Sequence, residues 1–262
     1  MAHPNRLNNA RVLVFGGTSG IGFGVASMAL SNGAIVTISG STKPKVDAKV
    51  QELQSFYPSV RVQGIPLDLS DTANLETNLE SLIKSVTNNG EQKLDHIVYC
   101  AGDALMLPKI HEVTVENALA GYHVRWLGPA FIGKLLATGK YMHSSRSSSF
   151  TLTGGVNTHK PFPGWAMGAS WGAASEGLSR GLAVDLKPIR VNLVAPGTIE
   201  TPLFDKFVEN VGREKEEEFK NKWTLLQAWG DVADIAETYG WLMRDYYVTG
   251  TVARSDGGRL LV

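Results

Sequence analysis

Apolar positions along the chain follow two patterns that alternate from one end to the other. Short, mostly continuous apolar runs bounded by turn residues predict buried strands at residues 10–15, 34–39, 60–67, 94–100, 149–153, 189–194 and 251–255. Between them, stretches with apolar residues three or four positions apart predict helices at residues 20–32, 45–56, 72–88, within 115–138, and at 166–186. This alternation predicts one α/β domain over residues 1–262, a doubly wound parallel sheet of about seven strands with helices on both faces.

Length and composition narrow the class of protein without changing this fold. The 262 residues suit one large domain, and the 25 basic and 25 acidic residues leave no basic excess of the kind that nucleic-acid binding needs. The single cysteine, Cys100, excludes a disulfide within the chain, which is typical of a reducing compartment. Residues 1–10 lack the apolar core of a signal peptide, and no apolar run reaches ~18 residues, so we expect a cytoplasmic protein without a membrane span.

A glycine-rich segment directly follows the first predicted strand and opens the first predicted helix. It reads Gly16-Gly17-Thr18-Ser19-Gly20-Ile21-Gly22. Glycines permit a tight turn and let the backbone approach a pyrophosphate, while the helix N-terminus points free N–H groups at the anion. This order of strand, turn and helix predicts a dinucleotide site rather than an ordinary turn. The residues we assign to cofactor binding here are Gly16, Thr18, Ser19, Gly20, Ile21 and Gly22.

The glycine spacing resembles that of the short-chain dehydrogenase/reductase (SDR) family, and the resemblance extends over nearly the whole chain. Further matches are Asp68, Ala101-Gly102, Arg190-Val191-Asn192, Pro196-Gly197 and Asp256-Gly257-Gly258. The resemblance implies a Rossmann-type fold and a small-molecule substrate. It also implies cofactor contacts at Asp68, Leu69, Cys100, Ala101, Gly102, Pro196, Gly197 and Thr201. A dimer or tetramer is implied as well, for which the apolar end Leu260-Leu261-Val262 is a candidate interface.

The end of the second predicted strand bears on which dinucleotide binds. A site for NAD needs a carboxylate there to bind the ribose hydroxyls, whereas a site for NADP needs hydroxyls or cations for the 2′-phosphate. The segment Ser39-Gly40-Ser41-Thr42-Lys43 has no acid, three hydroxyls and a lysine. We therefore predict NADP(H), bound by Ser39, Ser41, Thr42 and Lys43; the alternative is that these are loop residues that face water.

The four residues that carry out the family's chemistry are replaced in this chain. Met167 stands at the position of the Tyr and Trp171 at that of the Lys, while Gly154 replaces the Ser and Arg125 the Asn. Methionine and tryptophan are not general acids at neutral pH, and glycine has no side chain. Ketone reduction with a Tyr proton donor is therefore not expected. Met167 and Trp171 are expected to fill the vacated volume and make the pocket more apolar.

The loop before the helix at 166–186 reads Pro161-Phe162-Pro163-Gly164-Trp165. It resembles the Pro-Asp-Pro-Gly-Trp loop of a subgroup of fungal biosynthetic reductases that also lack the Tyr and Lys. This subgroup includes bifunctional reductase/Diels–Alderases that make bridged indole alkaloids. Because Phe162 stands where the subgroup has Asp, the resemblance supports an atypical reductase more than a Diels–Alderase.

Two residues are candidates for contact with the reacting groups. Arg125 either points its charge at a substrate carbonyl or the nicotinamide ribose, or forms a surface ion pair between helices. Trp165 either forms a wall of the pocket and stacks on a flat ring, or anchors its loop. We expect His123 and His159 to be structural and Cys100 to serve packing, and we predict no metal site.

Residues 198–229 correspond to the segment that the family uses as a substrate lid. Their large apolar residues indicate a bulky apolar substrate, or else pack the lid onto the body. These residues are Leu203, Phe204, Phe207, Phe219, Trp223 and Trp229.

Three functions from different classes are compatible with these features. The first is an NADPH-dependent reductase of a bulky activated acceptor, such as an imine or iminium, in secondary metabolism. The second is a non-redox enzyme, a cyclase or isomerase, that keeps the nucleotide as structure. The third is a regulatory pseudoenzyme, which the intact nicotinamide edge at Pro196 and Gly197 disfavours. The fold alone does not choose between them.

Overall fold

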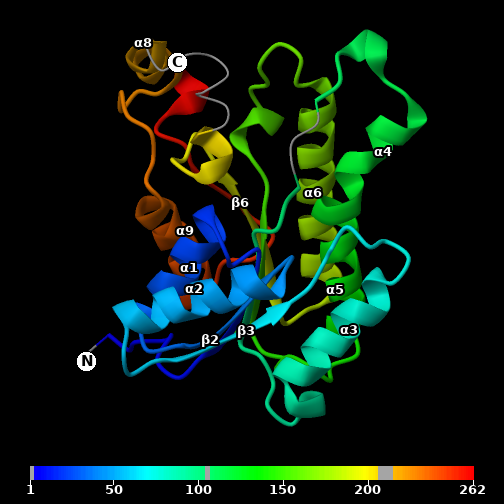
Figure 1. Ribbon diagram of the computed structural model, residues 1–262, viewed down its shortest axis with the longest axis vertical. Coiled ribbons are helices and arrows are strands. Elements are labelled where there is room, and N and C mark those ends of the chain that lie inside the picture. Colours follow the sequence, from blue (N-terminus) through cyan, green and yellow to red (C-terminus); the bar gives the residue numbers. More distant parts are fainter. Residues whose placement is uncertain (1–2, 104–106, 206–214) are drawn as a thin grey trace.

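Seven parallel strands form one sheet in the structure, a computed structural model that describes residues 3–103, 107–205 and 215–262. The strands run in the order β3-β2-β1-β4-β5-β6-β7 (Figure 1). Their bounds are β1 Arg11–Phe15, β2 Ile35–Gly40, β3 Arg61–Pro66, β4 His96–Tyr99, β5 Ser149–Thr153, β6 Arg190–Pro196 and β7 Val252–Ser255. The order reverses between β1 and β4, and doubly wound sheets bind their ligands beside such a reversal, at the carboxyl ends of the strands.

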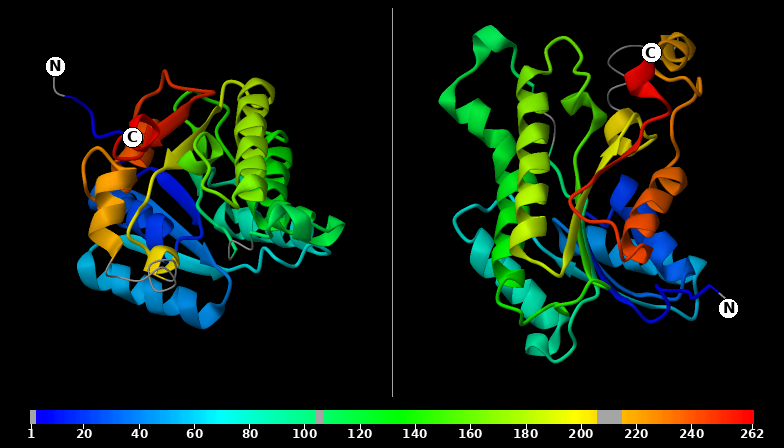
Figure 2. Two further views of the ribbon diagram at one scale, coloured as in Figure 1. Left: turned by 90° about the horizontal axis from the view of Figure 1, so that it is seen from above. Right: turned by 180° about the vertical axis from the view of Figure 1, so that it is seen from behind.

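Helices cover both faces of this sheet (Figures 1 and 2). Helices α1, α2 and α9 pack on one face, and α3, α5 and α6 on the other. The helix bounds are α1 Gly20–Ser31, α2 Lys43–Phe56, α3 Leu75–Val86, α4 Val115–Tyr122, α5 Gly128–Leu136, α6 Ala166–Asp185, α8 Glu216–Trp223 and α9 Val232–Arg244. Within the described ranges, no helix has both the length and the apolar character needed to cross a membrane.

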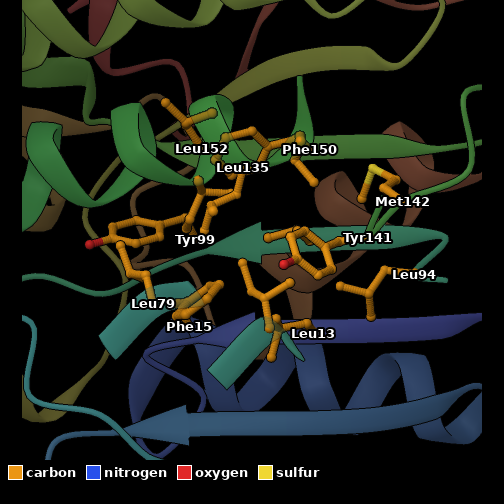
Figure 3. Packing of buried hydrophobic residues seen from close by; sticks show 14 of the residues in the cluster. Leu13, Phe15, Leu79, Leu94, Tyr99, Leu135, Tyr141, Met142, Phe150 and Leu152 are labelled. Atoms are coloured by element: carbon orange, nitrogen blue, oxygen red, sulfur yellow. The ribbon is translucent and has the colours of Figure 1, made fainter. Parts of the chain in front are cut away.

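The side chains of β1 explain why both faces are covered. Leu13 and Phe15 belong to the core beneath α3, α5 and α6, part of which Figure 3 shows, whereas Val12 and Val14 belong to the core beneath α1 and α9. Successive side chains of a strand point to opposite faces, so a strand buried on both sides reads as a continuous apolar run. The predicted doubly wound sheet of about seven strands is therefore confirmed.

The helical segment expected within 115–138 is divided in the structure. A π-helical turn, His123–Leu127, separates α4 from α5. Such a turn interrupts the regular ladder of helical hydrogen bonds. The Tyr99 hydroxyl donates to the Val124 carbonyl at 2.5 Å, and Gly128 leaves room for the tyrosine ring. Tyr99 thus stabilises this turn from the neighbouring strand.

His96 lies buried at the start of β4, with Nδ1 2.9 Å from the Ser149 hydroxyl. Burial, and then the charge of Arg190, lowers the pKa of His96 from its ordinary 6.5 to about 3. The unfolded chain therefore takes up a proton below about pH 6.5 that the folded chain refuses until about pH 3. The contribution of neutral His96 to the free energy of unfolding is fully present above about pH 6.5 and is lost as the pH falls from there toward pH 3.

When the pH is lowered from 7 to 5, we expect the free energy of unfolding to fall by about 2 kcal/mol because of His96. Urea unfolding at both pH values measures this loss. His96→Gln should remove most of the pH dependence that His96 causes, at some cost in stability. The same substitution at exposed His111 is the control and should leave the slope unchanged. An unchanged slope in His96→Gln would contradict the assignment.

Candidate cofactor and substrate site

The glycine turn forms a cradle that has no room for a side chain at Gly16 or Gly22. Gly16 has φ +75°, and a Cβ there would lie 2.6 Å from the Ala101 backbone nitrogen. A Cβ on Gly22 would lie 2.8 Å from the Gly16 carbonyl carbon and closer still to its oxygen. Gly20, at φ +48°, lies against the Thr201 side chain. The fold thus brings together three predicted cofactor segments that are far apart in the sequence.

Helix α1 begins inside this turn, with its first backbone N–H groups available to an anion. The Ser19 side chain makes no capping hydrogen bond, and the first turn of the helix carries no acid. A helix N-terminus of this kind attracts phosphate because its free N–H groups and its dipole act together. The cradle and the helix therefore fit the pyrophosphate of a dinucleotide.

The predicted 2′-phosphate residues divide into one enclosed and three exposed groups. Ser39 is buried in β2, with 2% of its surface exposed, whereas Ser41, Thr42 and Lys43 face solvent. Helix α2 begins at Lys43, two residues earlier than expected, because Pro44 suits a first helical turn. The ammonium of Lys43 pairs with Asp47 at 2.8 Å, and 73% of the lysine side chain is exposed. Such an exposed pair is weak, so a phosphate would compete for the lysine.

The remaining predicted cofactor residues lie at the same carboxyl edge of the sheet. The exposed Asp68 carboxylate accepts hydrogen bonds from the Ser70 hydroxyl at 2.6 Å and its backbone N–H at 2.9 Å, and both lower the pKa of Asp68. Leu69 beside it is buried. Gly197 follows β6, and a Cβ there would lie 2.6 Å from the Asp256 Cα, so the predicted nicotinamide edge contacts the C-terminal turn.

Cys100 follows β4 beside the cradle. Its sulfur accepts a hydrogen bond from Thr153 at 3.4 Å, and burial raises the pKa of the thiol to about 11. A thiol that stays protonated is a poor nucleophile. This environment agrees with the packing role expected of Cys100.

Trp171, at the position of the family's Lys, is turned into the helix layer. Its indole N–H donates to the Ala118 carbonyl of α4 at 3.0 Å, and its ring lies where a Cβ on Gly121 would be. Only 4% of Trp171 is exposed. It fills space, as expected, but it packs α6 against α4 and does not form a free wall of the pocket. Met167, one turn earlier, is half-buried.

Arg125 lies in the π-helical turn and reaches across to the end of β4. Its Nε is 3.1 Å from an Asp103 carboxylate oxygen, its Nη2 donates to the Asp103 carbonyl, and a Cβ on Gly102 would lie 2.5 Å from Nη1. Burial lowers the pKa of Arg125, while Asp103 acts in the opposite direction. Arg125 therefore contacts a predicted cofactor segment. Its partner is a loop aspartate, which the sequence analysis missed although it directly follows Ala101-Gly102.

Aromatic side chains from the loop after β5 and from the predicted lid form one cluster, which we call the aromatic cluster. Phe162 lies 6.2 Å from Trp165 and 4.6 Å from Trp223, measured between ring centroids. Trp223 in turn stacks on Phe219 at 4.4 Å and lies 6.0 Å from Trp229. The cluster comprises Phe162, Trp165, Phe204, Phe219, Trp223 and Trp229.

This clustering agrees with the packing of the lid onto the body. Residues 206–214 of the predicted lid, including Phe207, lie outside the described residues.

His159 is 2.8 Å from the buried Glu176 carboxylate, which agrees with the structural role expected for it. His123 is exposed in the π-helical turn.

The sequence model of a protein family, described as an SDR-like Rossmann domain, matches residues 3–262. The chain belongs to the short-chain dehydrogenase/reductase family. Two fungal members of the family align over nearly their full lengths. The short-chain dehydrogenase/reductase malC of Malbranchea aurantiaca is 37% identical over 97% of this chain and 96% of its own. The short-chain dehydrogenase/reductase fsr5 of Gibberella fujikuroi is 36% identical over 99% of this chain and 97% of its own.

Solved SDR structures share the fold. The MalC reductase/Diels–Alderase of Malbranchea aurantiaca has a TM-score of 0.92 at 36% identity and covers 99% of this chain and 100% of its own. A short-chain dehydrogenase of Burkholderia cenocepacia, in complex with NADP, has a TM-score of 0.81 at 24% identity over 97% and 99% of the two chains. The predicted SDR family and its Rossmann-type fold, which binds a nicotinamide cofactor, are thereby confirmed.

Proposed function

We propose that this SDR protein is an NADPH-dependent reductase of a bulky apolar substrate that carries an imine, an iminium or a similarly activated acceptor, in fungal secondary metabolism. The observation that supports this most is the combination of an intact dinucleotide cradle with a site that has lost its proton donors. Gly16 and Gly22 keep the cradle, while Gly154, Met167 and Trp171 supply no acid. The similarity to fungal SDR proteins supports the biosynthetic setting.

The charge change in the substrate explains why such a site suffices. When bound, the reduced nicotinamide supplies a hydride. In an iminium the hydride adds to carbon and the C=N electron pair moves onto nitrogen, which cancels a positive charge and needs no proton. In a ketone the same addition leaves an oxyanion, which must be protonated or held by donors. This chain's residues then need only hold the acceptor in place, and positioning alone contributes strongly to rates.

Two arrangements in the site support this assignment of roles. Trp165 and Phe162 provide aromatic surface for a flat substrate. Arg125 is neutralised by Asp103 and lies against Gly102, which suits a contact with the nicotinamide ribose or a substrate carbonyl more than general acid catalysis. For NADPH over NADH, the support is the exposed Ser41, Thr42 and Lys43 and the lack of an acid within residues 39–43 at the end of β2.

The deciding experiment follows deuterium from NADPH labelled at C4 on either face. The probes are 3,4-dihydroisoquinoline and its N-methyl iminium salt, with 1-tetralone as the matched ketone. We expect deuterium in the reduced amines, little or none in the alcohol, and tighter binding of NADPH than of NADH in a fluorescence titration. Equal or tighter binding of NADH would contradict the NADPH assignment.

A non-redox cyclase or isomerase is the second candidate, supported by similarity to the MalC reductase/Diels–Alderase. Phe162 stands where the related loop has an aspartate, and it packs on Trp223 rather than presenting a polar group. A substrate turned over with no NADPH oxidised and no deuterium incorporated would refute the reductase and favour this candidate.

The expected dimer or tetramer stays a prediction. Leu261 and Val262 are 79% and 37% exposed and are thus accessible for an interface.

A further inference from the structure

Arg259 is a buried arginine whose guanidinium forms no ion pair among the described residues; burial lowers its pKa, and the charge of Asp256 acts in the opposite direction. It lies in the C-terminal turn and is 5% exposed. Its Cζ lies 4.5 Å from the centre of the Phe162 ring, within the aromatic cluster. Its backbone carbonyl accepts from Lys160 at 3.3 Å, which adds a second cation nearby. Within the described ranges, neither a carboxylate nor a carbonyl accepts a hydrogen bond from the guanidinium itself.

Two other arginines, the buried Arg190 and the half-buried Arg125, show how the described part of the chain pairs a guanidinium. Arg190, 3% exposed, donates to the backbone carbonyls of Arg146, Leu242 and Met243. Arg125 has the Asp103 carboxylate. Buried guanidinium groups are costly without such partners. Arg259 differs from both, because among the described residues only the charge of Asp256 acts on it and no group accepts a hydrogen bond from its guanidinium, which leaves its N–H groups for a ligand.

The position of Arg259 connects it with the substrate side of the site. The C-terminal turn contacts the nicotinamide edge, since a Cβ on Gly197 would lie 2.6 Å from the Asp256 Cα. It also holds the predicted lid, because the Leu225 backbone N–H donates to the Gly257 carbonyl at 2.8 Å. Figure 1 shows the C-terminal turn, α8 and the segment after β6 gathered at one end of the molecule.

The guanidinium also keeps an open edge. Some side-chain nitrogens and oxygens of the described residues are fully enclosed and lack a hydrogen-bond partner, such as Arg125 Nε. No nitrogen of Arg259 is among them, so the unpaired nitrogens of Arg259 are not fully enclosed. The guanidinium carbon lies over the Phe162 ring, and no described group accepts a hydrogen bond from the guanidinium N–H groups. A planar fork of N–H donors matches two oxygen atoms that share a negative charge.

We propose that Arg259 binds a pair of anionic oxygen atoms on the substrate, as in a carboxylate or an ionised 1,3-dicarbonyl, while the aromatic cluster stacks on the substrate's flat ring. This deepens the proposed function and rests on it, because it takes the same sheet edge as the substrate site. The substrate then carries its acceptor carbon toward the nicotinamide edge and its anionic group toward the C-terminal turn. A bare cation beside Arg259 is disfavoured.

The test is calorimetric titration of the NADPH-saturated protein at neutral pH with four aromatic probes. They are 2-naphthylacetate, ionised 2-phenylindane-1,3-dione, neutral 2-naphthylacetamide and cationic 2-(2-naphthyl)ethylamine. We expect at least one anion to bind about tenfold or more tightly than the amide, and the amine to bind most weakly. Which anion binds separates the carboxylate from the dicarbonyl. Equal affinities for anions and amide, as a purely structural Arg259 requires, would overturn the proposal.

Variants assign the preference to the residue. Arg259→Gln should bring the ratio of anion to amide affinity close to one, and Arg259→Lys should retain part of it because the charge remains. The control is Arg254→Gln in β7, an exposed arginine of the same terminal segment, which should leave the ratio unchanged. An anion preference that survives in Arg259→Gln would also overturn the proposal.

Failure of this inference and failure of the proposed function give different results. Arg259 makes no contact with the glycine cradle, so Arg259→Gln should keep the NADPH affinity of the parent protein. If dihydroisoquinoline is reduced but anions are not preferred, the reductase stands and the Arg259 assignment falls. If anions are preferred through Arg259 but no hydride is transferred to any probe, the binding site stands and the reductase falls.

Discussion

Gly22→Ala is expected to weaken NADPH binding by about 100-fold. The added methyl group would overlap the Gly16 carbonyl, which is backbone of the same turn and cannot move aside without displacing the cradle. Nicotinamide fluorescence titration measures the affinity, and thermal unfolding on the same sample shows whether the variant is folded. The expected result is a folded protein with a turn displaced from its phosphate-binding geometry.

The matched control is the same substitution in α6. Gly177 and Gly181 have no atom within 4 Å of an added Cβ, so Gly177→Ala and Gly181→Ala should keep full NADPH affinity. Alanine favours a helix over glycine by up to about 1 kcal/mol, so these controls should be equally or more stable. A Gly22→Ala protein that binds NADPH as tightly as its parent would show that the turn is not the dinucleotide cradle.

Restoring the family's lysine is expected to destabilise the protein rather than to create ketone reductase activity. Trp171→Lys should lower the free energy of unfolding by about 3–5 kcal/mol, because it removes a buried ring and buries an ammonium group in its place. The ring contact with Gly121 and the hydrogen bond to Ala118 are both lost. Chemical denaturation measures the loss. Trp241→Lys in α9, where 44% of the tryptophan is exposed, should cost less than about 1 kcal/mol.

The double variant Met167→Tyr/Trp171→Lys should therefore not reduce 1-tetralone at a useful rate. Gly154 and Arg125 still stand where the family has Ser and Asn, and residues that act as one unit lose activity together. In addition, the lysine would replace a side chain that faces α4. Native stability together with robust ketone turnover in this variant would contradict our description of the site.

The π-helical turn links the fold to the candidate chemistry. Tyr99 donates to Val124 within it, and Trp171, at the position of the family's Lys, packs on Gly121 just before it, so both residues hold this helix. The turn carries Arg125 toward Asp103 and Gly102. Tyr99 and Trp171 thus stabilise the element that positions Arg125.

Much of the fold and the cofactor cradle was predictable from sequence because the signals are local. The continuous apolar run of β1 requires burial on both faces, and the positive φ angles at Gly16 and Gly20 favour glycine there. The order of strand, turn and helix then indicates the site for phosphate. Such features depend on neighbours a few residues away, so the chain itself specifies them.

The tertiary structure alone decided which side chains meet at the site. The periodicity of residues 115–138 does not reveal the π-helical turn, because one extra residue per turn barely alters an apolar pattern. The pairing of Arg125 with Asp103, the rotation of Trp171 toward α4, and the stacking of Arg259 on Phe162 each join distant segments. Sequence spacing carries no information about such contacts, because packing of the sheet and helices sets the distances between them.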